Sequence, residues 1–291
     1  MQKQFEIKSL RCSYDKEYVE GKSKVVLEIE HLELPRGKKI FIVGESGIGK
    51  STILETLGMM NNTIVKDKEA CLNFYTKDDE KIDLKTLWRS RNESALSDFR
   101  LKNYSFIFQS TNLMRNFTAF ENIAFTRMLQ GYSKFQCYQR TRAVLAELGL
   151  EHVDESRMAH ELSGGQQQRL AFARAILPDF SVLFGDEPTG NLDGENAVRV
   201  MEILSSKLTE LDDASAIIVS HDMHLAVTFA DIIIKIRKEI RPKLHDYDED
   251  ITYGVIDDSC VYVRTQDEDG LWSNGDKSFG DVEFEEFLRK K

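Results

Sequence analysis

Residues 44–51 have the residue types and spacing of a loop that binds phosphate groups. They read Gly-Glu-Ser-Gly-Ile-Gly-Lys-Ser and fit the pattern G-x-x-x-x-G-K-[ST]. The glycines let backbone N–H groups converge on phosphate oxygens without Cβ clashes. A helix beginning near Lys50 adds its positive end, and the Lys50 ammonium is expected to reach the β- and γ-phosphates. The pattern predicts triphosphate binding by Gly44, Glu45, Ser46, Gly47, Ile48, Gly49, Lys50, Ser51 and Thr52.

Two carboxylates follow a short apolar run further along the chain. Val182-Leu183-Phe184 leads through Gly185 into Asp186 and Glu187, which predicts a buried strand that ends in an acidic pair. Asp186 is expected to lie beside a Mg²⁺ ion, through water, with the Ser51 hydroxyl as a direct ligand. Glu187 is then free to polarise an attacking water. The alternative is a surface Asp-Glu pair that caps a strand. Taken with the loop, the pair predicts an ATPase that uses ATP and Mg²⁺.

A second glycine motif occupies residues 162–166, Leu-Ser-Gly-Gly-Gln. Ser163 stands at an N-cap-like position before Gly164 and Gly165, so the helix that opens here offers a second anion site. One globular domain does not need two phosphate cradles for one nucleotide. We therefore expect each chain to offer its second cradle to the ATP of a partner, in a two-fold pair that buries two ATP molecules.

Short apolar runs and helical patterns alternate along the chain and give the elements that must position these motifs. The run 39–43 leads straight into the glycine loop, and residues 51–60 continue as a helix. Further strands are expected at 4–10, 25–34, 104–108, 181–184, 216–219 and 232–236, a hairpin at 71–75 and 82–84, and helices at 117–149, with a break near Gly131, and at 163–177. This order predicts an α/β fold with a mostly parallel sheet that is covered on both faces.

The charge is spread unevenly. The chain of 291 residues has a net charge of −10, of which residues 242–291 contribute 14 Asp/Glu against 6 Lys/Arg. An acidic chain is a poor electrostatic match for nucleic acid or an anionic lipid surface, so no nucleic-acid partner is expected. The imbalance predicts a domain over residues 1–241 that ends near Pro242, followed by an acidic extension, 242–291.

The extension has enough aromatic and β-branched residues to fold. Val255-Ile256 and Cys260-Val261-Tyr262-Val263 flank a turn-like Asp257-Asp258-Ser259 and predict a hairpin. Trp272 and later apolar positions, including a terminal helix, could pack on it. A solvated acidic tail is the alternative.

The sequence also predicts where the protein resides. No apolar run approaches the ~18–20 residues that span a bilayer, and residues 1–7 lack the apolar stretch of a signal peptide. We therefore expect a cytoplasmic protein. Its four cysteines are widely spaced without a C-x-x-C pair, which argues against a zinc site or a disulfide framework.

The motifs occur in the order found in the ATP-binding-cassette ATPases, which the chain resembles over roughly residues 4–240. They are Gly44–Thr52, Gln109, Leu162–Gln166, Val182–Glu187, Asn191-Leu192-Asp193 and His221. The resemblance implies a nucleotide-binding domain with an N-terminal antiparallel β subdomain and a helical subdomain at about 110–177. It also implies a head-to-tail homodimer, with ATP between the glycine loop of one subunit and Ser163, Gly164, Gly165 and Gln166 of the other.

The same resemblance implies roles for single residues. Gln109 touches Mg²⁺ and the attacking water, and Asp193 lies across the dimer interface. His221 contacts the γ-phosphate, so that Lys50, Glu187 and His221 form the catalytic set. Tyr14 stands where the family places an aromatic ring that stacks on adenine; a tyrosine at a strand edge is the alternative.

A narrower resemblance is to the lipoprotein-releasing, macrolide-exporting and cell-division ATPases. Residues 186–193, 163–169, 112–113 and 118–122 carry it. It implies a separate transmembrane subunit that docks near residues 110–130 and holds the ATPase at the cytoplasmic face of the cell membrane. The chain departs from this subgroup at Ile48, where a small residue is usual, and at Arg237-Lys238-Glu239, which replaces a glycine turn. The extension 242–291 has no counterpart in the short members.

Two other functions compete with a membrane complex. A soluble cassette protein could act on DNA, RNA or ribosomes, but the DNA-repair type has a long coiled coil and the ribosome type has two cassettes per chain. A nucleotide-binding regulator without turnover would not need Lys50, Glu187 and His221 together. The leading hypothesis is an ATPase subunit of a membrane transporter or mechanotransmission complex.

Overall fold

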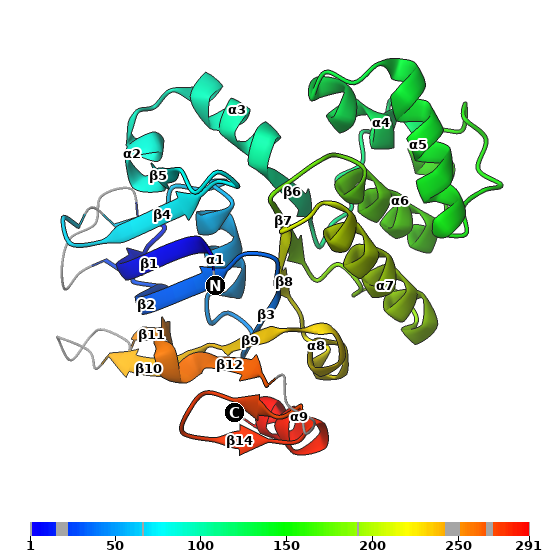
Figure 1. The fold of residues 1–291 in the computed structure, drawn as a ribbon. Coiled ribbons are helices and arrows are strands. Elements are labelled where there is room, and N and C mark those ends of the chain that lie inside the picture. Colours follow the sequence, from blue (N-terminus) through cyan, green and yellow to red (C-terminus); the bar gives the residue numbers. More distant parts are fainter. Residues whose placement is uncertain are drawn as a thin grey trace. The chain divides into compact units, whose positions relative to one another are not determined.

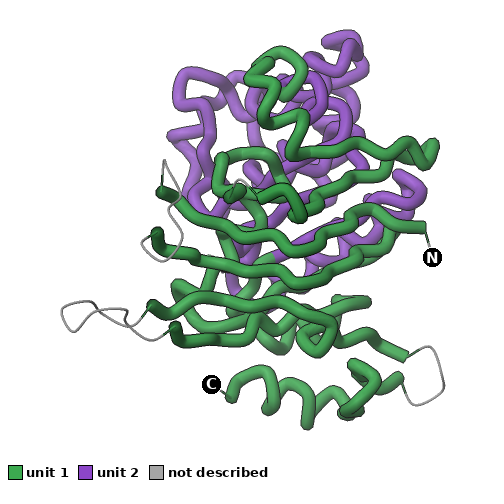
Figure 2. The backbone as a smooth tube through the Cα atoms, turned by 90° about the vertical axis from the view of Figure 1, so that its left-hand side faces the viewer, with its two compact units in different colours: residues 1–96, 219–291 green, residues 97–218 purple. Residues whose placement is uncertain are grey.

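The computed structural model describes residues 2–15, 23–65, 67–190, 192–241, 251–265 and 270–290. The chain divides into two compact units (Figure 2). Unit 1 combines residues 1–96 with residues 219–291, and unit 2 is residues 97–218. Figure 1 labels most of the elements, which are described below unit by unit.

Unit 1 contains a largely antiparallel sheet in the order β10-β11-β2-β1-β4-β5. Its strands are β1 (Lys3–Cys12), β2 (Leu27–Pro35), β4 (Cys71–Tyr75), β5 (Lys81–Asp83), β10 (Arg237–Arg241) and β11 (Ile251–Ile256). β1 pairs antiparallel with β2 and β4, and Phe5 and Ile7 are fully buried on one face. The alternate residues, Glu6 and Lys8, belong to the opposite face, as the two-residue period of a strand requires.

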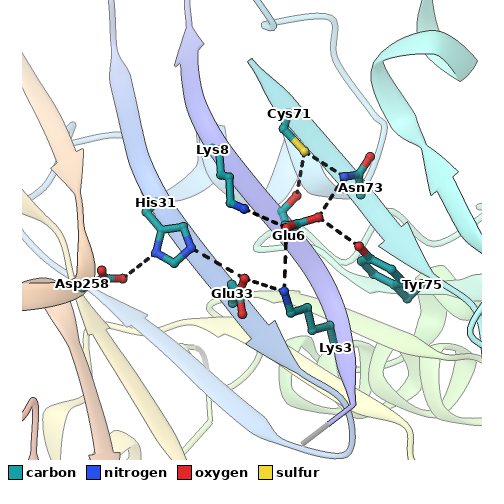
Figure 3. Close-up of polar contacts among 9 residues, drawn as sticks. All are labelled: Lys3, Glu6, Lys8, His31, Glu33, Cys71, Asn73, Tyr75 and Asp258. Carbon is teal, nitrogen blue, oxygen red and sulfur yellow. Dashed lines mark hydrogen bonds and ion pairs between the residues drawn. The ribbon is translucent and has the colours of Figure 1, made fainter. Parts of the chain in front are cut away.

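The polar face of this sheet is held by a network around Glu6 (Figure 3). The Glu6 carboxylate accepts hydrogen bonds from Lys8 Nζ at 2.9 Å, Asn73 Nδ2 at 3.1 Å and Tyr75 OH at 2.9 Å. These donors, Lys8 above all, lower the pKa of Glu6 to about 2. The network therefore ties β4 to β1 through a carboxylate that stays charged.

The second sheet of unit 1 carries the glycine loop. Its order within the unit is β14-β13-β12-β9-β3, and β9 runs parallel to β3. The strands are β3 (Lys39–Val43), β9 (Ile232–Lys235), β12 (Val261–Arg264), β13 (Trp272–Ser273) and β14 (Ser278–Phe279). The unit's helices are α1 (Lys50–Leu57), α2 (Leu84–Arg89), α8 (Met223–Phe229) and α9 (Asp281–Arg289), and α9 packs against α8.

The predicted hairpin over residues 255–263 is wrong. β11 pairs antiparallel with β10 and parallel with β2, whereas β12 pairs with β9 in the other sheet. The short turn η2 (Asp258–Cys260) passes the chain from one sheet to the other, and Asp258 Oδ1 lies 2.8 Å from His31 Nδ1 on β2 (Figure 3). Trp272 is fully buried and stacks on Phe284 of α9 at 5.1 Å. The described part of the extension is thus built into both sheets of unit 1. Pro242 lies outside the described residues, and the boundary there stays a prediction.

Unit 2 holds three strands in the order β8-β7-β6 together with helices. β6 (Tyr104–Ile107) and β7 (Val182–Asp186) are parallel, and β8 (Ser215–Val219) lies on the other side of β7. The helices are α3 (Glu93–Asn103), which begins in unit 1, α4 (Ala119–Leu129), α5 (Lys134–Glu147), the short 3₁₀ turn η1 (Ala159–Glu161), α6 (Gly164–Ile176) and α7 (Gly194–Glu210). α4 packs on both α5 and α6. The helical segment that carries the second glycine motif is therefore one packed group.

The predicted α/β fold, with its antiparallel and helical parts, is confirmed. β3 pairs parallel with β9 and β6 pairs parallel with β7. The predicted hairpin at 71–75 and 82–84 and the predicted helix break near Gly131, where φ is +95°, are present. Helices α2 and α3 were not predicted. Among the described residues, no helix is long and apolar enough to cross a bilayer.

Candidate nucleotide-binding and hydrolysis site

The glycine loop of unit 1 joins β3 to α1. Gly49, its last residue, has φ +103°, and a Cβ there would lie 3.2 Å from Leu27 Cβ and 3.3 Å from the Val26 carbonyl oxygen. A larger residue would be strained in that backbone conformation and would press on β2. The loop can therefore close tightly at the start of α1 only because this position is glycine. In the middle of the loop, Ser46 and Gly47 are exposed.

The Lys50 side chain lies inside this loop. It is 6% exposed, and its Nζ donates to the carbonyl oxygens of Gly44 at 2.9 Å and Glu45 at 2.7 Å. The loop's own carbonyl oxygens therefore hold the Lys50 ammonium, a cation that can pair with an anion. Ser51, the next residue, is exposed in the first turn of α1, whereas Thr52 is buried.

Tyr14 lies beside the same helix. Its hydroxyl is 2.8 Å from Glu55 Oε2 and 3.2 Å from Thr52 Oγ1, while 54% of the residue is exposed. Partial burial raises the pKa of Tyr14, with Glu55 adding to the effect, so the phenol stays neutral. The hydroxyl fixes the ring on α1 and leaves surface available for stacking.

His221 follows the end of β8 and is exposed. The preceding Ser220 N–H donates to Ile42 O on β3 at 3.3 Å, and the following Asp222 caps α8 by accepting from Leu225 N at 3.0 Å. The His221 backbone is thus fixed on both sides, next to the strand that leads into the glycine loop. His221 and the glycine loop both belong to unit 1.

In unit 2, the ends of two parallel strands bring Gln109 and Glu187 together. Ile107 on β6 is level with Gly185 on β7, and each candidate lies two residues beyond its partner in that pair. Gln109 Nε2 donates to Glu187 Oε2 at 3.3 Å. Because the Gln109 amide donates its N–H group to the Glu187 carboxylate, its oxygen is the atom suited to bind a cation.

Glu187 has a strained backbone. Its φ is +50°, which is uncommon for a residue with a side chain, and its carbonyl accepts from Gly190 N at 3.1 Å in a tight turn. Gln168 of α6 donates to the adjacent Pro188 carbonyl at 3.2 Å. The turn holds the carboxylate at the strand end, and strain of this kind is typical of functional positions.

Asp186 is the last residue of β7 and is half-buried. Within the described residues, no group of three or more His, Cys, Asp or Glu side chains could hold a metal ion. The predicted set of Ser51, Gln109 and Asp186 consists of oxygen donors, as Mg²⁺ prefers, and it leaves coordination sites for phosphate and water.

The second glycine motif forms the N-terminus of α6, as predicted. The Ser163 hydroxyl accepts from Gln166 N at 3.4 Å, and Gln166 Oε1 accepts from Ser163 N at 2.9 Å, which makes a capping box. Ser163 and Gly164 are exposed, and Gly165 is half-exposed. Among the described residues, a Cβ at Gly164 or Gly165 would meet nothing within 4 Å.

Asp193 has a local role besides the one that the family resemblance implies. It is the N-cap of α7, and its carboxylate accepts from Asn196 N at 2.9 Å, which lowers its pKa. The sequence Asp193-Gly194-Glu195-Asn196 carried that capping signal. Asn191 of the same motif lies outside the described residues.

Each unit thus brings part of the predicted set together. Unit 1 holds the glycine loop, Tyr14 and His221 on connected elements, and unit 2 holds Gln109, Asp186 and Glu187 at one set of strand ends. The motifs did not reveal Lys238, whose Nζ lies 3.0 Å from Glu45 Oε2 in the glycine loop.

Comparison with known proteins identifies the family. The family described as ABC transporter matches residues 27–190, which is more than half of the chain. The chain therefore belongs to the ABC transporter family. The match runs from β2 through the glycine loop and the second glycine motif to the Glu187 turn.

Individual ABC proteins are similar over a longer stretch. The lipoprotein-releasing system ATP-binding protein LolD of Idiomarina loihiensis is 37% identical over 219 residues, which are 75% of this chain and 90% of that protein. The macrolide export ATP-binding/permease protein MacB of Campylobacter fetus is 37% identical over 217 residues, and the chain spans 31% of its length.

A solved ABC structure bears on the reaction. The dimeric post-hydrolysis state of the cassette MJ0796, bound to ADP and Pi, matches with TM-score 0.64 and 28% identity, over 79% of this chain and 93% of that one. The chain is an ABC ATPase that binds ATP and hydrolyses it.

Proposed function

We propose that this ATPase works as a head-to-tail homodimer with two ATP molecules at its interface. It couples their hydrolysis to a separate transmembrane subunit, at the cytoplasmic face of the cell membrane. The observation that carries the proposal is the exposed N-terminus of α6, whose two glycines have no packing role within the described chain. Glycine in the first turn of a helix costs stability, so its presence there favours close approach by something outside the chain.

In the proposed dimer, the group that approaches the N-terminus of α6 is the ATP bound to the partner. A helix N-terminus with a Ser cap presents N–H groups and a positive partial charge, which suit a γ-phosphate. Ser163, Gly164, Gly165 and Gln166 would contact the nucleotide held by the partner's glycine loop, with Asp193 nearby. The dimer of MJ0796 with ADP and Pi supports this arrangement.

Hydrolysis would use phosphate-binding residues and a general base. Lys50 and the loop hold the β- and γ-phosphates, Tyr14 stacks on adenine, and His221 contacts the γ-phosphate. Glu187 accepts a proton from the attacking water, while Gln109 keeps the carboxylate oriented through their hydrogen bond.

Mg²⁺ would be held by the Ser51 hydroxyl, the Gln109 amide oxygen and, through water, Asp186. The ion would neutralise negative charge on the phosphates. The donor types fit, because each residue offers an oxygen to a cation that prefers oxygen ligands.

The docking site for the transmembrane subunit is proposed on unit 2 near residues 110–130. A cavity of about 510 Å³ lies there, lined by Thr111, Asn112, Leu113, Arg115, Ala159, His160 and Gln167. In the same helical segment, α4 exposes Leu129 at 55% and Met128 at 39%, and α5 exposes Phe135 at 70%. Exposed apolar side chains of this size favour a protein partner. Two relatives are named a lipoprotein-releasing system ATP-binding protein and a macrolide export ATP-binding/permease protein, and these names support a membrane partner.

The test is the variant Glu187→Gln, which removes the base and keeps the phosphate cradle. Hydrolysis should fall by about 10²–10⁴-fold. With ATP and Mg²⁺ the variant should run as a dimer in size-exclusion chromatography with light scattering. Glu202→Gln, at an exposed position of α7, is the matched control and should hydrolyse ATP normally.

Two outcomes would contradict the proposal. A Glu187→Gln protein that binds ATP and stays monomeric would rule out the shared-site dimer. Purification of this variant with ATP from detergent-solubilised membranes should recover a multi-span protein, and recovery of ribosomes or DNA instead would overturn the membrane role.

A further inference from the structure

A cavity of about 640 Å³ lies in unit 1 between the glycine loop and the C-terminal extension. Gly44, Glu45 and Ile48 line it, whereas Ser46, Gly47 and Lys50 do not. It is therefore separate from the face of the loop that is expected to hold phosphate. Its volume falls in the range of small-molecule sites.

The cavity is basic in an acidic protein. Six cationic side chains line it, against the two carboxylates Glu45 and Asp276. The six are Lys235, Arg237, Lys238, Lys277, Arg289 and Lys290. The chain as a whole carries −10, so this concentration of positive charge favours an anionic ligand.

Two of these cations are available to a ligand. Within the described residues, no carboxylate lies within ion-pair distance of Lys277 or Lys290, and both side chains are exposed. Arg289, by contrast, pairs with Glu285 at 2.6 Å, and Arg237 pairs with Asp257 at 2.8 Å.

The cavity also has an aromatic wall. The Tyr262 and Phe287 rings lie 5.5 Å apart, and Lys235 Nζ is 4.3 Å from the centre of the Phe287 ring. Lys277 Nζ lies 5.9 Å from the same ring. Aromatic rings flanked by ammonium groups suit a ligand that combines a flat apolar part with negative charge.

The cavity touches the glycine loop directly. Lys238 of the lining pairs with Glu45, and β11 lies against the loop at Gly254. A Cβ at Gly254 would overlap the Ile48 carbonyl oxygen and come within 2.8 Å of Ile236 Cγ2. A ligand near Lys238 would thus contact an ion pair of the loop that holds ATP.

We propose that this cavity is a second ligand site, for a small organic anion with a planar apolar group, formed jointly by the C-terminal extension and the back of the glycine loop. The proposal does not depend on the dimer or on the membrane partner. The negative group lies among Lys277, Lys290 and Lys238, and the flat part lies against Tyr262 and Phe287.

In the test, phenyl phosphate is titrated into the full chain, and binding is measured by isothermal calorimetry or ligand-observed NMR. Saturating MgADP is present to occupy the nucleotide site. Saturable binding is expected with a Kd near or below about 1 mM, in keeping with so small a probe. Benzoate tests whether a carboxylate serves as well as a phosphate, and at least one of the two must bind. Inorganic phosphate and benzyl alcohol, which carry the charge or the ring alone, should bind at least tenfold more weakly.

Lys277→Glu should weaken the tighter probe at least tenfold, with an unchanged melting temperature. Lys81→Glu, the same charge change at an exposed position of β5, should leave binding unchanged. If Lys277→Glu proves unstable, Lys290→Glu takes its place. Absence of saturable binding by both phenyl phosphate and benzoate, or equal weakening by Lys81→Glu, would overturn the site. If the probe binds without MgADP and MgADP abolishes that binding, the probe occupies the nucleotide site, and this result would also overturn the proposed second site.

Discussion

The two glycine motifs differ in how they pack against the rest of their own chain. In the first, Gly49 is pressed against Leu27 and Val26, and the loop encloses a buried Lys50. In the second, Gly164 and Gly165 have open space around them among the described residues. The first motif is therefore formed by packing within its own subunit, whereas the second is a surface available to a partner.

The largest effect is expected from Lys50→Ala. Removing a buried ammonium from a phosphate site should weaken ATP binding by about 10²–10³-fold, in line with the loss of a charge-assisted interaction of a few kcal/mol. Isothermal calorimetry with MgATP measures it. Lys81→Ala, an exposed lysine on β5, is the control. Unchanged affinity in Lys50→Ala would refute the assignment of the first motif.

Gly165→Asp tests the second motif at its open surface. The new carboxylate should repel a partner's triphosphate and lower ATP hydrolysis by about 10²-fold, because close like charges cost several kcal/mol. Binding of MgATP to the monomer should not change. An acidic residue in the first turn stabilises a helix by about 0.3–1 kcal/mol, so the melting temperature of the variant should stay the same or rise.

The control for that variant is Val282→Asp, which places the same carboxylate in the first turn of α9 at a position 74% exposed. It should leave hydrolysis unchanged. If Gly165→Asp hydrolyses ATP at the normal rate, the second motif does not act across an interface.

Gly49→Ala measures how firmly the first motif is embedded. The substitution combines a disfavoured backbone conformation with contact against Leu27 and should destabilise unit 1 by about 1–3 kcal/mol. Gly165→Ala should instead change stability by less than about 1 kcal/mol and in the stabilising direction. Urea unfolding of both variants compares them directly, and equal effects would remove the distinction between the motifs.

Most of the strands around the site could be predicted, because they are short apolar runs bounded by turn residues. The motifs themselves were visible as spacing. The N-cap role of Asp193 was missed although its signal is local, an Asp followed three residues later by Asn196 at the start of a helix. The positive φ of Glu187 could not be predicted, since it arises from the turn to Gly190 and the contact of Gln168 with Pro188.

The C-terminal extension shows where local patterns fail. Residues 255–263 look like a hairpin because two apolar runs flank a turn. β11 instead pairs with β2, more than 200 residues earlier in the chain, and no local signal specifies such a pairing. Helices α2 and α3 were missed for a different reason: their surfaces are mostly polar, and few side chains such as Leu84 and Leu96 are buried.

The smallest expected effect concerns the sheet behind the first motif. The lowered pKa of Glu6, about 2 against an ordinary 4.5, means that its stabilisation is complete above about pH 4.5 and is lost as the pH falls towards 2. Glu6→Gln should therefore be less stable than the parent at pH 7, by about 1 kcal/mol after allowing for solvent around Lys8, and the difference should shrink on acidification.

Hydrogen exchange then locates the effect. Glu6 holds β1 and β4, and β1 pairs with β2, whose Leu27 contacts Gly49. Glu6→Gln should therefore speed exchange in α1, behind the first motif, and leave α6 unchanged. Glu30→Gln, at an exposed position of β2, is the control. Faster exchange in α6 as well would mean that the two motifs share one cooperative structure, and that the second is not independent of the packing that forms the first.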